Sequence, residues 1–322
     1  MRRRSFAFGV AATAAAVAVP ASAQQRLKVV ASFSILGDMV REIGGDRVEL
    51  TTLVGPDQDA HTYQPTPSDA RALAAARVLV VNGLGFEGWI DRLARAAPFA
   101  GTRVVASAGV ATIAGAAAGH GHGHGHAHGG GEESLSTRKT QAAPKAAPDP
   151  HCWQDVANGA RYARNIAQAL VAADAANAAH YRQRADAYDR RLTELDAWVR
   201  AQIGTVPAAK RKVITGHDAF GYFARAYGVA FRAPVGISTE NEPSARDVAA
   251  LIRQIRSEGI KALFIENMSN PKLVEQIARD AGGVVGPALH VDALSKPGGP
   301  ADTYERMFRH NVPALVAGML RN

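Results

Sequence analysis

Histidine gives this 322-residue chain its most evident chemistry, and five of its 11 histidines stand in one short stretch. The stretch GHGHGHGHAHGGG, residues 119–131, alternates histidine with small residues, and its histidines are His120, His122, His124, His126 and His128. Imidazole nitrogens bind zinc and other transition metals. A flexible chain must lose much backbone entropy to wrap an ion. We therefore predict that this tract binds metal weakly, as an accessory collector.

Four further candidates lie where a predicted strand gives way to a loop or a helix. They are His61 in GPDQDAHTYQPTPSD, His151 in PDPHCWQD, His217 at the end of KVITGH and Asp292 in ALHVDALSKPGGP. Taken singly, each histidine is more commonly a cap or surface residue, and the aspartate a turn residue. In open α/β sheets, however, ligands gather at the carboxyl ends of strands. Because two candidates belong to each half of the chain, they favour one metal site in a cleft between two lobes.

The other residues that could bind a metal are assigned to packing. His180 stands in the middle of a predicted helix and His310 in the last helix, so both are interpreted as surface or packing residues. His290 alternates with valine in the last predicted strand and is interpreted as structural. Cys152 adjoins His151, but neighbouring residues on an extended segment point to opposite sides. We expect Cys152 to be a buried, unreactive thiol.

Apolar strands that alternate with helices must position these candidates in the first half of the chain. Strands are predicted at 27–33, 48–53, 78–83 and 103–107, with a helix near 35–43. A second helix is signalled by Thr66 as N-cap, Pro67 at the first position and Asp69 three residues after the cap. This alternation predicts a parallel sheet covered on both faces. From about 109 to 150 the pattern fails, and we predict a long mobile loop.

Two helical stretches follow the predicted loop, and after the second, a long helix, the α/β alternation begins again. The helix is predicted to begin at a capping Asp174, and its apolar stripe consists of Tyr181, Ala185, Tyr188, Leu192, Leu195 and Val199. About 28 helical residues would span roughly 40 Å. The segments KVITGH, GVAFRA, KALFIE and GVVGPAL are predicted strands, and helices are predicted at 219–227, 245–257, 272–281 and about 301–320. The fold class is therefore α/β, with two similar parallel-sheet lobes joined by one long rigid helix.

The N-terminus predicts export. MRRRSFAFGVAATAAAVAVPASAQQ has a basic start, an apolar run too short to span a membrane, and a cleavage signal that ends at Ala23. Arg3 and Arg4 before Ser5 and Phe6 also resemble a twin-arginine signal, so the Sec and twin-arginine routes both stay open. We expect residues 1–23 to be removed and the mature protein to be periplasmic. The remaining boundaries are predicted as an N-terminal lobe at 24–170, a linking helix at 171–205 and a C-terminal lobe at 206–322.

Charge and cysteine content exclude several classes of protein. The formal charge of +8 falls to +5 once the three arginines of the signal segment are removed, and the remaining basic residues are scattered. Nucleic-acid binding is therefore not expected. Cys152 is the single cysteine, so no internal disulfide can form, and no cysteine follows Ala23 to carry a lipid anchor.

Five longer segments resemble a known family. GPDQDAHTYQPTPSD, DPHCWQD, ITGHDAFGYFARAYG, FIENMSNPKLVEQIARDAG and VDALSKPGGPADTYERMFRHN resemble the metal-receptor solute-binding proteins of ABC transporters, which import zinc, manganese or iron. The resemblance covers nearly the whole mature chain in the family's order. It implies two α/β lobes bridged by a rigid helix, one metal ion between them, and an ABC transporter permease in the inner membrane as partner. The family's ligand positions fall on His61, His151, His217 and Asp292. We also expect the protein to be a monomer.

The residue types at these positions favour Zn²⁺ as the transported ligand. Three neutral imidazoles and one carboxylate suit a tetrahedral zinc ion. Manganese-type members of the family carry glutamate where this chain has His217, and a His-rich loop is typical of the zinc members. Some zinc members have an acidic residue where this chain has Ala60, which places more weight on Asp292. Glu266 matches a recurrent position near the cleft, and we expect it to support a ligand rather than to contact the metal.

Other functions are weighed against a zinc receptor. A manganese or iron receptor of the same family is the alternative, and a metal-dependent adhesin of the same fold is a weaker one. A secreted zinc hydrolase is a remote alternative, because a catalytic zinc keeps an open position whereas four protein ligands would close the tetrahedron here. No HExxH motif is present either. We therefore predict that the protein is not an enzyme.

Overall fold

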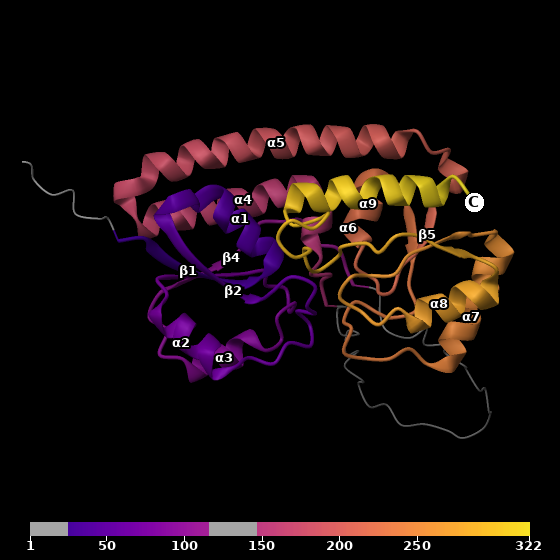
Figure 1. Ribbon diagram of the computed structural model, residues 1–322, viewed down its shortest axis with the longest axis horizontal. Coiled ribbons are helices and arrows are strands. Elements are labelled where there is room, and N and C mark those ends of the chain that lie inside the picture. The colour runs from indigo at the N-terminus through magenta and orange to yellow at the C-terminus, as the bar shows by residue number, and fades with distance from the viewer. Residues whose placement is uncertain (1–24, 116–146) are drawn as a thin grey trace, which may run out of the picture.

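Two α/β lobes lie side by side beneath one long helix (Figure 1). The computed structural model describes residues 25–115 and 147–322. The predicted signal segment and the His-rich tract, with His120 to His128, lie outside the described residues. Within the described ranges, no helix is long and apolar enough to cross a membrane.

The N-terminal lobe is built on a four-stranded parallel sheet in the order β2-β1-β3-β4. Its strands are β1 (Leu27–Phe33), β2 (Val48–Val54), β3 (Val78–Val81) and β4 (Thr102–Val105), and its helices are α1 (Ser34–Gly44), α2 (Pro67–Ala75), α3 (Ile90–Ala96) and α4 (Val156–Ala173). Helices α1 and α4 cover one face of the sheet, and α2 and α3 the other (Figure 1). The predicted capping box of α2 is present, since Thr66 and Asp69 bond to each other's backbone. Helix α3 was not predicted, because seven residues with two buried side chains give little periodicity.

The C-terminal lobe repeats this plan with shorter strands in the order β6-β5-β7-β8. Its strands are β5 (Lys212–Ile214), β6 (Ala230–Arg232), β7 (Ala262–Leu263) and β8 (Val284–Val285), and its helices are α6 (Gly221–Tyr227), α7 (Ala245–Glu258), α8 (Lys272–Ala281) and α9 (Tyr304–Met319). The predicted strands are longer than these because regular pairing stops early. Single parallel bridges between His217 and Val235 and between Glu266 and Leu289 continue their direction toward the cleft.

Helix α5 (Ala178–Gly204) runs along both lobes (Figure 1). It packs against α1 and α4 of the first lobe and against α9 of the second. Its 27 residues span about 40 Å, as predicted. The predicted apolar stripe is buried against the two lobes, except that Ala185 is only partly buried. The prediction that Asp174 caps this helix was wrong. Asp174 ends α4, and a short 3-10 turn (Ala175–Asn177) separates it from α5.

The buried side chains form two hydrophobic clusters, and the larger one spans both lobes. The larger cluster of buried side chains includes Trp153 and Tyr162 from the first lobe together with Phe223 and Phe308 from the second. Tyr304 at the start of α9 donates a hydrogen bond to the Trp153 carbonyl at 2.5 Å. Since a close-packed core transmits displacement rather than absorbing it, the lobes are held in a defined relative position.

Candidate metal centre

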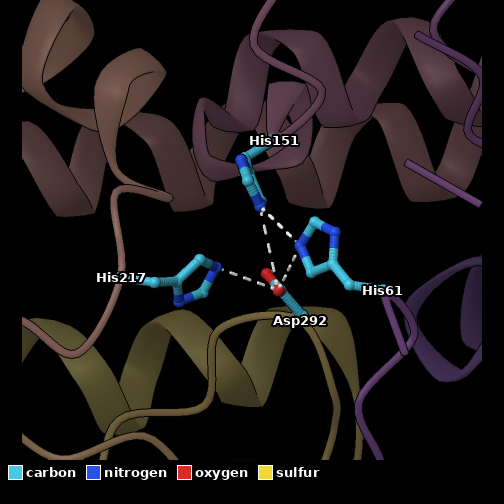
Figure 2. A group of neighbouring side chains, drawn as sticks. All are labelled: His61, His151, His217 and Asp292. Atoms are coloured by element: carbon cyan, nitrogen blue, oxygen red, sulfur yellow. Dashed lines mark hydrogen bonds and ion pairs between the residues drawn. The ribbon is translucent and has the colours of Figure 1, made fainter. Parts of the chain in front are cut away.

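His61, His151, His217 and Asp292 converge between the lobes (Figure 2). One nitrogen or oxygen from each lies within 4.8 Å of the others. The Nε2 atoms of His61 and His151 are 3.3 Å apart. Asp292 Oδ2 lies 3.3 Å from His61 Nε2, 3.8 Å from His151 Nε2 and 3.1 Å from His217 Nε2. The structure therefore brings together the four residues that the sequence singled out.

Each of the four side chains follows a strand of one of the two sheets. His61 lies in the loop after β2, and His151 in the segment that leads from beyond β4 into α4. His217 follows β5, and Asp292 follows β8 and the bridge at Leu289. Every strand is parallel within its sheet, so each sheet has one carboxyl edge, and the convergence of the four side chains places both edges at the same cleft.

Two aspartates that the sequence analysis missed fix the backbone of two of these histidines. Asp59 Oδ1 accepts a hydrogen bond from the His61 N–H at 2.8 Å, and Asp149 Oδ1 accepts one from the His151 N–H at 2.9 Å. Both aspartates stand two residues before the histidine, in DAH and DPH. An aspartate that bonds to the backbone two residues on is a common turn device. The repeated spacing was a signal that sequence reasoning could have used.

Carboxylates also orient two of the imidazole rings. Asp149 Oδ1 lies 2.8 Å from His151 Nδ1, and Glu266 Oε2 lies 2.7 Å from His217 Nδ1. Glu266 Oε1 accepts the His217 backbone N–H at 3.0 Å as well. A proton on Nδ1 that is donated to a carboxylate leaves the Nε2 lone pair directed at the centre, and it makes that nitrogen more basic. Glu266 thus fixes the orientation of the His217 ring through Nδ1, the ring nitrogen that does not face the centre.

Charge and burial shift the proton equilibria of this group. Burial lowers the pKa of His151, but the negative charge of Asp292 and the hydrogen bond with Asp149 outweigh it and raise the pKa to about 9. Burial lowers the pKa of His217 in the same way, and the charges of Glu266 and Asp292 raise it well above its ordinary value. Burial raises the pKa of Asp292, but the neighbouring histidines hold it well below its usual range.

Three polar atoms at the centre are buried without a hydrogen-bond partner among the described residues. They are His217 Nε2, Asp292 Oδ1 and Asp292 Oδ2. A buried carboxylate with neither oxygen hydrogen-bonded is costly unless a cation lies against it. A bond length of 2.0–2.1 Å in a tetrahedral zinc site places ligand atoms about 3.3–3.4 Å apart. Four of the six separations among the candidate ligand atoms, 3.1 to 3.8 Å, lie near that length, and all six lie within 4.8 Å.

Aromatic side chains enclose the group on the side of the first lobe. The Phe86 ring lies 4.7 Å from the His61 ring, and the Trp153 ring lies 5.3 Å from the His151 ring, centroid to centroid. Trp89 Nε1 donates to the Ala60 carbonyl at 2.8 Å. The Ala60 side chain offers no oxygen, so Asp292 contributes the single carboxylate of the converging group.

The remaining described histidines and the cysteine serve packing, as predicted. His180 Nε2 contacts the Gly44 carbonyl at 3.1 Å, and His310 Nε2 contacts the Ala288 carbonyl at 2.9 Å. His290 is held through its backbone by Asn311, but it lies beyond β8 rather than in the last strand, so that detail was wrong. Cys152 is fully buried, and burial raises the pKa of its thiol to about 11.

Relatives of known name match nearly the whole chain. The manganese-binding lipoprotein MntA of Halalkalibacterium halodurans is 30% identical over 293 residues, which cover 91% of this chain and 88% of that protein. The iron ABC transporter substrate-binding lipoprotein MtsA of Streptococcus pyogenes serotype M1 is 28% identical over 302 residues, which cover 92% of this chain and 90% of that protein.

A solved structure and a family model agree with these relatives. The periplasmic zinc binding protein TroA from Treponema pallidum superposes with a TM-score of 0.78 at 30% sequence identity, covering 92% of this chain and all of that one. Residues 29–318 match the family described as ZnuA, zinc-uptake complex component A, periplasmic. The names of the relatives include manganese, iron and zinc, so they do not select the metal. The chain belongs to the ZnuA family of periplasmic metal-binding receptors of ABC transporters, whose members are solute-binding proteins and not enzymes.

Proposed function

We propose that the protein is a zinc receptor that holds one Zn²⁺ between its lobes and delivers it to an ABC permease in the inner membrane. The proposed ligand atoms are Nε2 of His61, His151 and His217 and a carboxylate oxygen of Asp292. The observation that carries the proposal is this donor set of three imidazoles and one carboxylate, buried and spaced near the edge length of a zinc tetrahedron.

Zinc is favoured over manganese and iron by the chemistry of the donors. Mn²⁺ prefers carboxylate, carbonyl and water oxygens in six-coordinate sites, and affinity for nitrogen ligands rises from Mn²⁺ through Fe²⁺ toward Zn²⁺. Three nitrogens against one carboxylate, with aromatic rings around two of the imidazoles, match the zinc end of that series. The names MntA and MtsA favour the alternative, a manganese or iron receptor.

The His-rich tract is proposed to collect zinc weakly beside the site. The segment that carries it leaves the described fold after Gly115 and returns at Ala147, and the Gly115 N–H donates to the Ala147 carbonyl at 2.8 Å. The Asp149 N–H donates to the Ile113 carbonyl at 3.0 Å, so the residues on either side of the segment are paired with each other next to His151. A tethered set of weak ligands raises the local zinc concentration without a new tight site.

We also propose that the protein is exported and is a monomer. We propose cleavage after Ala23, with Sec or twin-arginine export, and the lobe boundaries given above. The scattered basic residues support a protein that does not bind nucleic acid.

Metal analysis of tag-free protein tests the proposal. The full chain and a variant that lacks residues 119–131 are each exposed to equimolar zinc, manganese and ferrous iron and then freed of excess metal. We expect one tightly bound zinc per chain in both proteins, additional weakly bound zinc only in the full chain, and no hydrolytic activity. Manganese or iron in the tight site would favour the alternative. A deletion variant without tight zinc would show that the tract supplies a principal ligand.

A further inference from the structure

The proposed ligands are nearly sealed from solvent, and His61 is the most accessible of them. His61 is 5% exposed, whereas His217 is 1% exposed and His151 and Asp292 are not exposed. A cavity of about 220 Å³ is lined by His61 but by none of the other three. Such a volume holds several water molecules, so an ion can enter it with part of its hydration shell. His61 is therefore the ligand that an ion in this cavity meets first.

Three chain segments contribute the walls of this cavity. From the first lobe, the lining residues are at 84–86 and 88, before α3, and at 147, 148 and 150, before His151. From the second lobe they are Ile237, Ser238 and Glu240, which flank Thr239 in the segment 237–240. Glu240 is exposed on the third wall, where its carboxylate can attract a hydrated cation. The opening thus lies between the lobes, and its width depends on where the segment 237–240 is held.

One hydrogen bond ties that segment to the loop of His61. Thr239 Oγ1 donates to Asp59 Oδ2 at 2.6 Å, while the other oxygen of Asp59 accepts the His61 backbone N–H at 2.8 Å. A single carboxylate therefore joins the third wall to the ligand at the inner end of the cavity. Asp57 holds the beginning of the same loop on the second lobe, through the Leu294 carbonyl and the Asn267 side chain. Loss of the Thr239 bond therefore detaches the segment 237–240 from Asp59, while Asp57 still holds the beginning of the loop and Trp89 still holds the Ala60 carbonyl.

We propose that this cavity is the passage by which the metal ion enters and leaves, and that the hydrogen bond from Thr239 to Asp59 is the latch that sets the rate. Thr239 is a positioning residue, since it acts on the ion only through Asp59 and the wall. The inference rests on the proposed function in that the four residues must hold a metal ion. It does not depend on the ion being zinc.

The latch is tested by replacing Thr239 with valine, which keeps the shape and removes the donor. Full-length protein loaded with one equivalent of Zn²⁺ is mixed with a chromogenic chelator in a stopped-flow instrument. We expect Thr239→Val to release zinc about tenfold faster than the wild type, the effect of losing one hydrogen bond to a carboxylate. Zinc entry should accelerate as well, so the equilibrium affinity changes much less. Thr239→Ser retains the hydroxyl and should restore the wild-type rate.

The absorption spectrum of bound Co²⁺ separates a latch from a general structural role. The same spectrum in wild type and Thr239→Val shows an unchanged ligand set, as the latch requires. A valine variant that releases zinc within about twofold of the wild type, or a serine variant as fast as valine, would overturn the latch.

A second test narrows the passage instead of loosening it. Gly88 lines the cavity, and a Cβ added there meets no atom within 4 Å, so Gly88→Leu can fill the space without a clash at the backbone. We expect entry and release to slow together, severalfold, with the equilibrium affinity unchanged. Gly204→Leu is the matched control, because Gly204 has the same open surroundings at the end of α5 and does not line the cavity.

The outcomes of this second test are distinct. Wild-type rates in Gly88→Leu, with zinc still bound, would overturn the passage and leave the proposed function standing. A wild-type protein that binds no Zn²⁺, Mn²⁺ or Co²⁺ at this site would instead overturn the proposed function, and the passage with it.

Discussion

Asp292 Oδ2 lies 3.1 Å from His217 Nε2, and neither atom has a hydrogen-bond partner within the described part of the chain. Glu266 holds the opposite edge of the same imidazole at 2.7 Å. His217 is thus placed between two buried carboxylates, one of which orients the ring while the other shares the centre with it. This arrangement is suited to an imidazole that presents its lone pair to a cation.

Replacing Glu266 with glutamine tests its supporting role. The amide keeps the shape but removes the charge that makes His217 more basic, so we expect zinc affinity to fall by about 10–100-fold. Competition with a chelator of known affinity measures the change. The control is Glu194→Gln, which removes an exposed carboxylate from α5. Equal affinity in Glu266→Gln and the control would contradict the role given to Glu266.

The metal-free protein should lose stability as the pH rises through about 9. The pKa of His151 is raised from 6.5 to about 9 in the folded protein, mainly because the attraction of Asp292 and the bond to Asp149 outweigh burial. A raised pKa contributes stability that is fully present below 6.5 and is lost as the pH passes through the folded value. Zinc binds neutral imidazole, so the stabilisation that it provides should grow over the same range.

Thermal unfolding with and without zinc measures this pH dependence. The unfolding temperatures should be compared above pH 7, because buried Asp38 itself titrates near there. Burial raises the pKa of Asp38 to about 7 despite its hydrogen bond from the Tyr304 N–H. A metal-free protein whose unfolding temperature rises between that pH and about 10 would contradict the charge arrangement described for the site.

Metal binding should close the lobes very little. Helix α5 packs on both lobes, and the buried core runs continuously from Trp153 to Phe308. A domain rotation would have to bend a helix of 27 residues or break that core. Small-angle scattering of the metal-free and zinc-loaded proteins should give closely similar profiles. A difference that requires a large rotation would show that the lobes are joined less rigidly.

The metal preference should move with the chemistry of position 217. His217→Glu gives the site two nitrogens and two carboxylates, a harder set that favours Mn²⁺. We expect manganese to compete with zinc more effectively in this variant than in the wild type, in metal competition followed by elemental analysis. Unchanged competition would mean that His217 does not contact the ion.

Much of this architecture could be predicted from local sequence patterns. The apolar runs of β1 and β3, the capping box at Thr66 and the stripe of α5 each depend on residues within a few turns of one another. Three of the four converging residues were predicted because they follow predicted strands, and parallel strands end at one edge of a sheet. His151 was placed with them because it stands between the predicted loop and a predicted helix.

What the patterns did not predict depends on contacts between distant parts of the chain. Thr239 and Asp59 are separated by 180 positions, so no local periodicity pairs them. Glu266 is 49 positions from His217, and its supporting role was expected only from the family resemblance. Asp174 was assigned as a helix cap because aspartate favours that position, but a 3-10 turn moves the start of α5 beyond it. Regular pairing of β7 and β8 stops after two residues each and resumes at the bridge between Glu266 and Leu289, an interruption that the apolar run of one strand does not reveal.

Crystallography of the zinc-loaded protein, with data on both sides of the zinc absorption edge, tests the central claim most directly. We predict one strong anomalous peak between the lobes, about 2.0–2.1 Å from Nε2 of each of the three histidines and about 2.0–2.2 Å from an oxygen of Asp292. A principal peak elsewhere, or one at this centre that lacks any of these four contacts, would contradict the account.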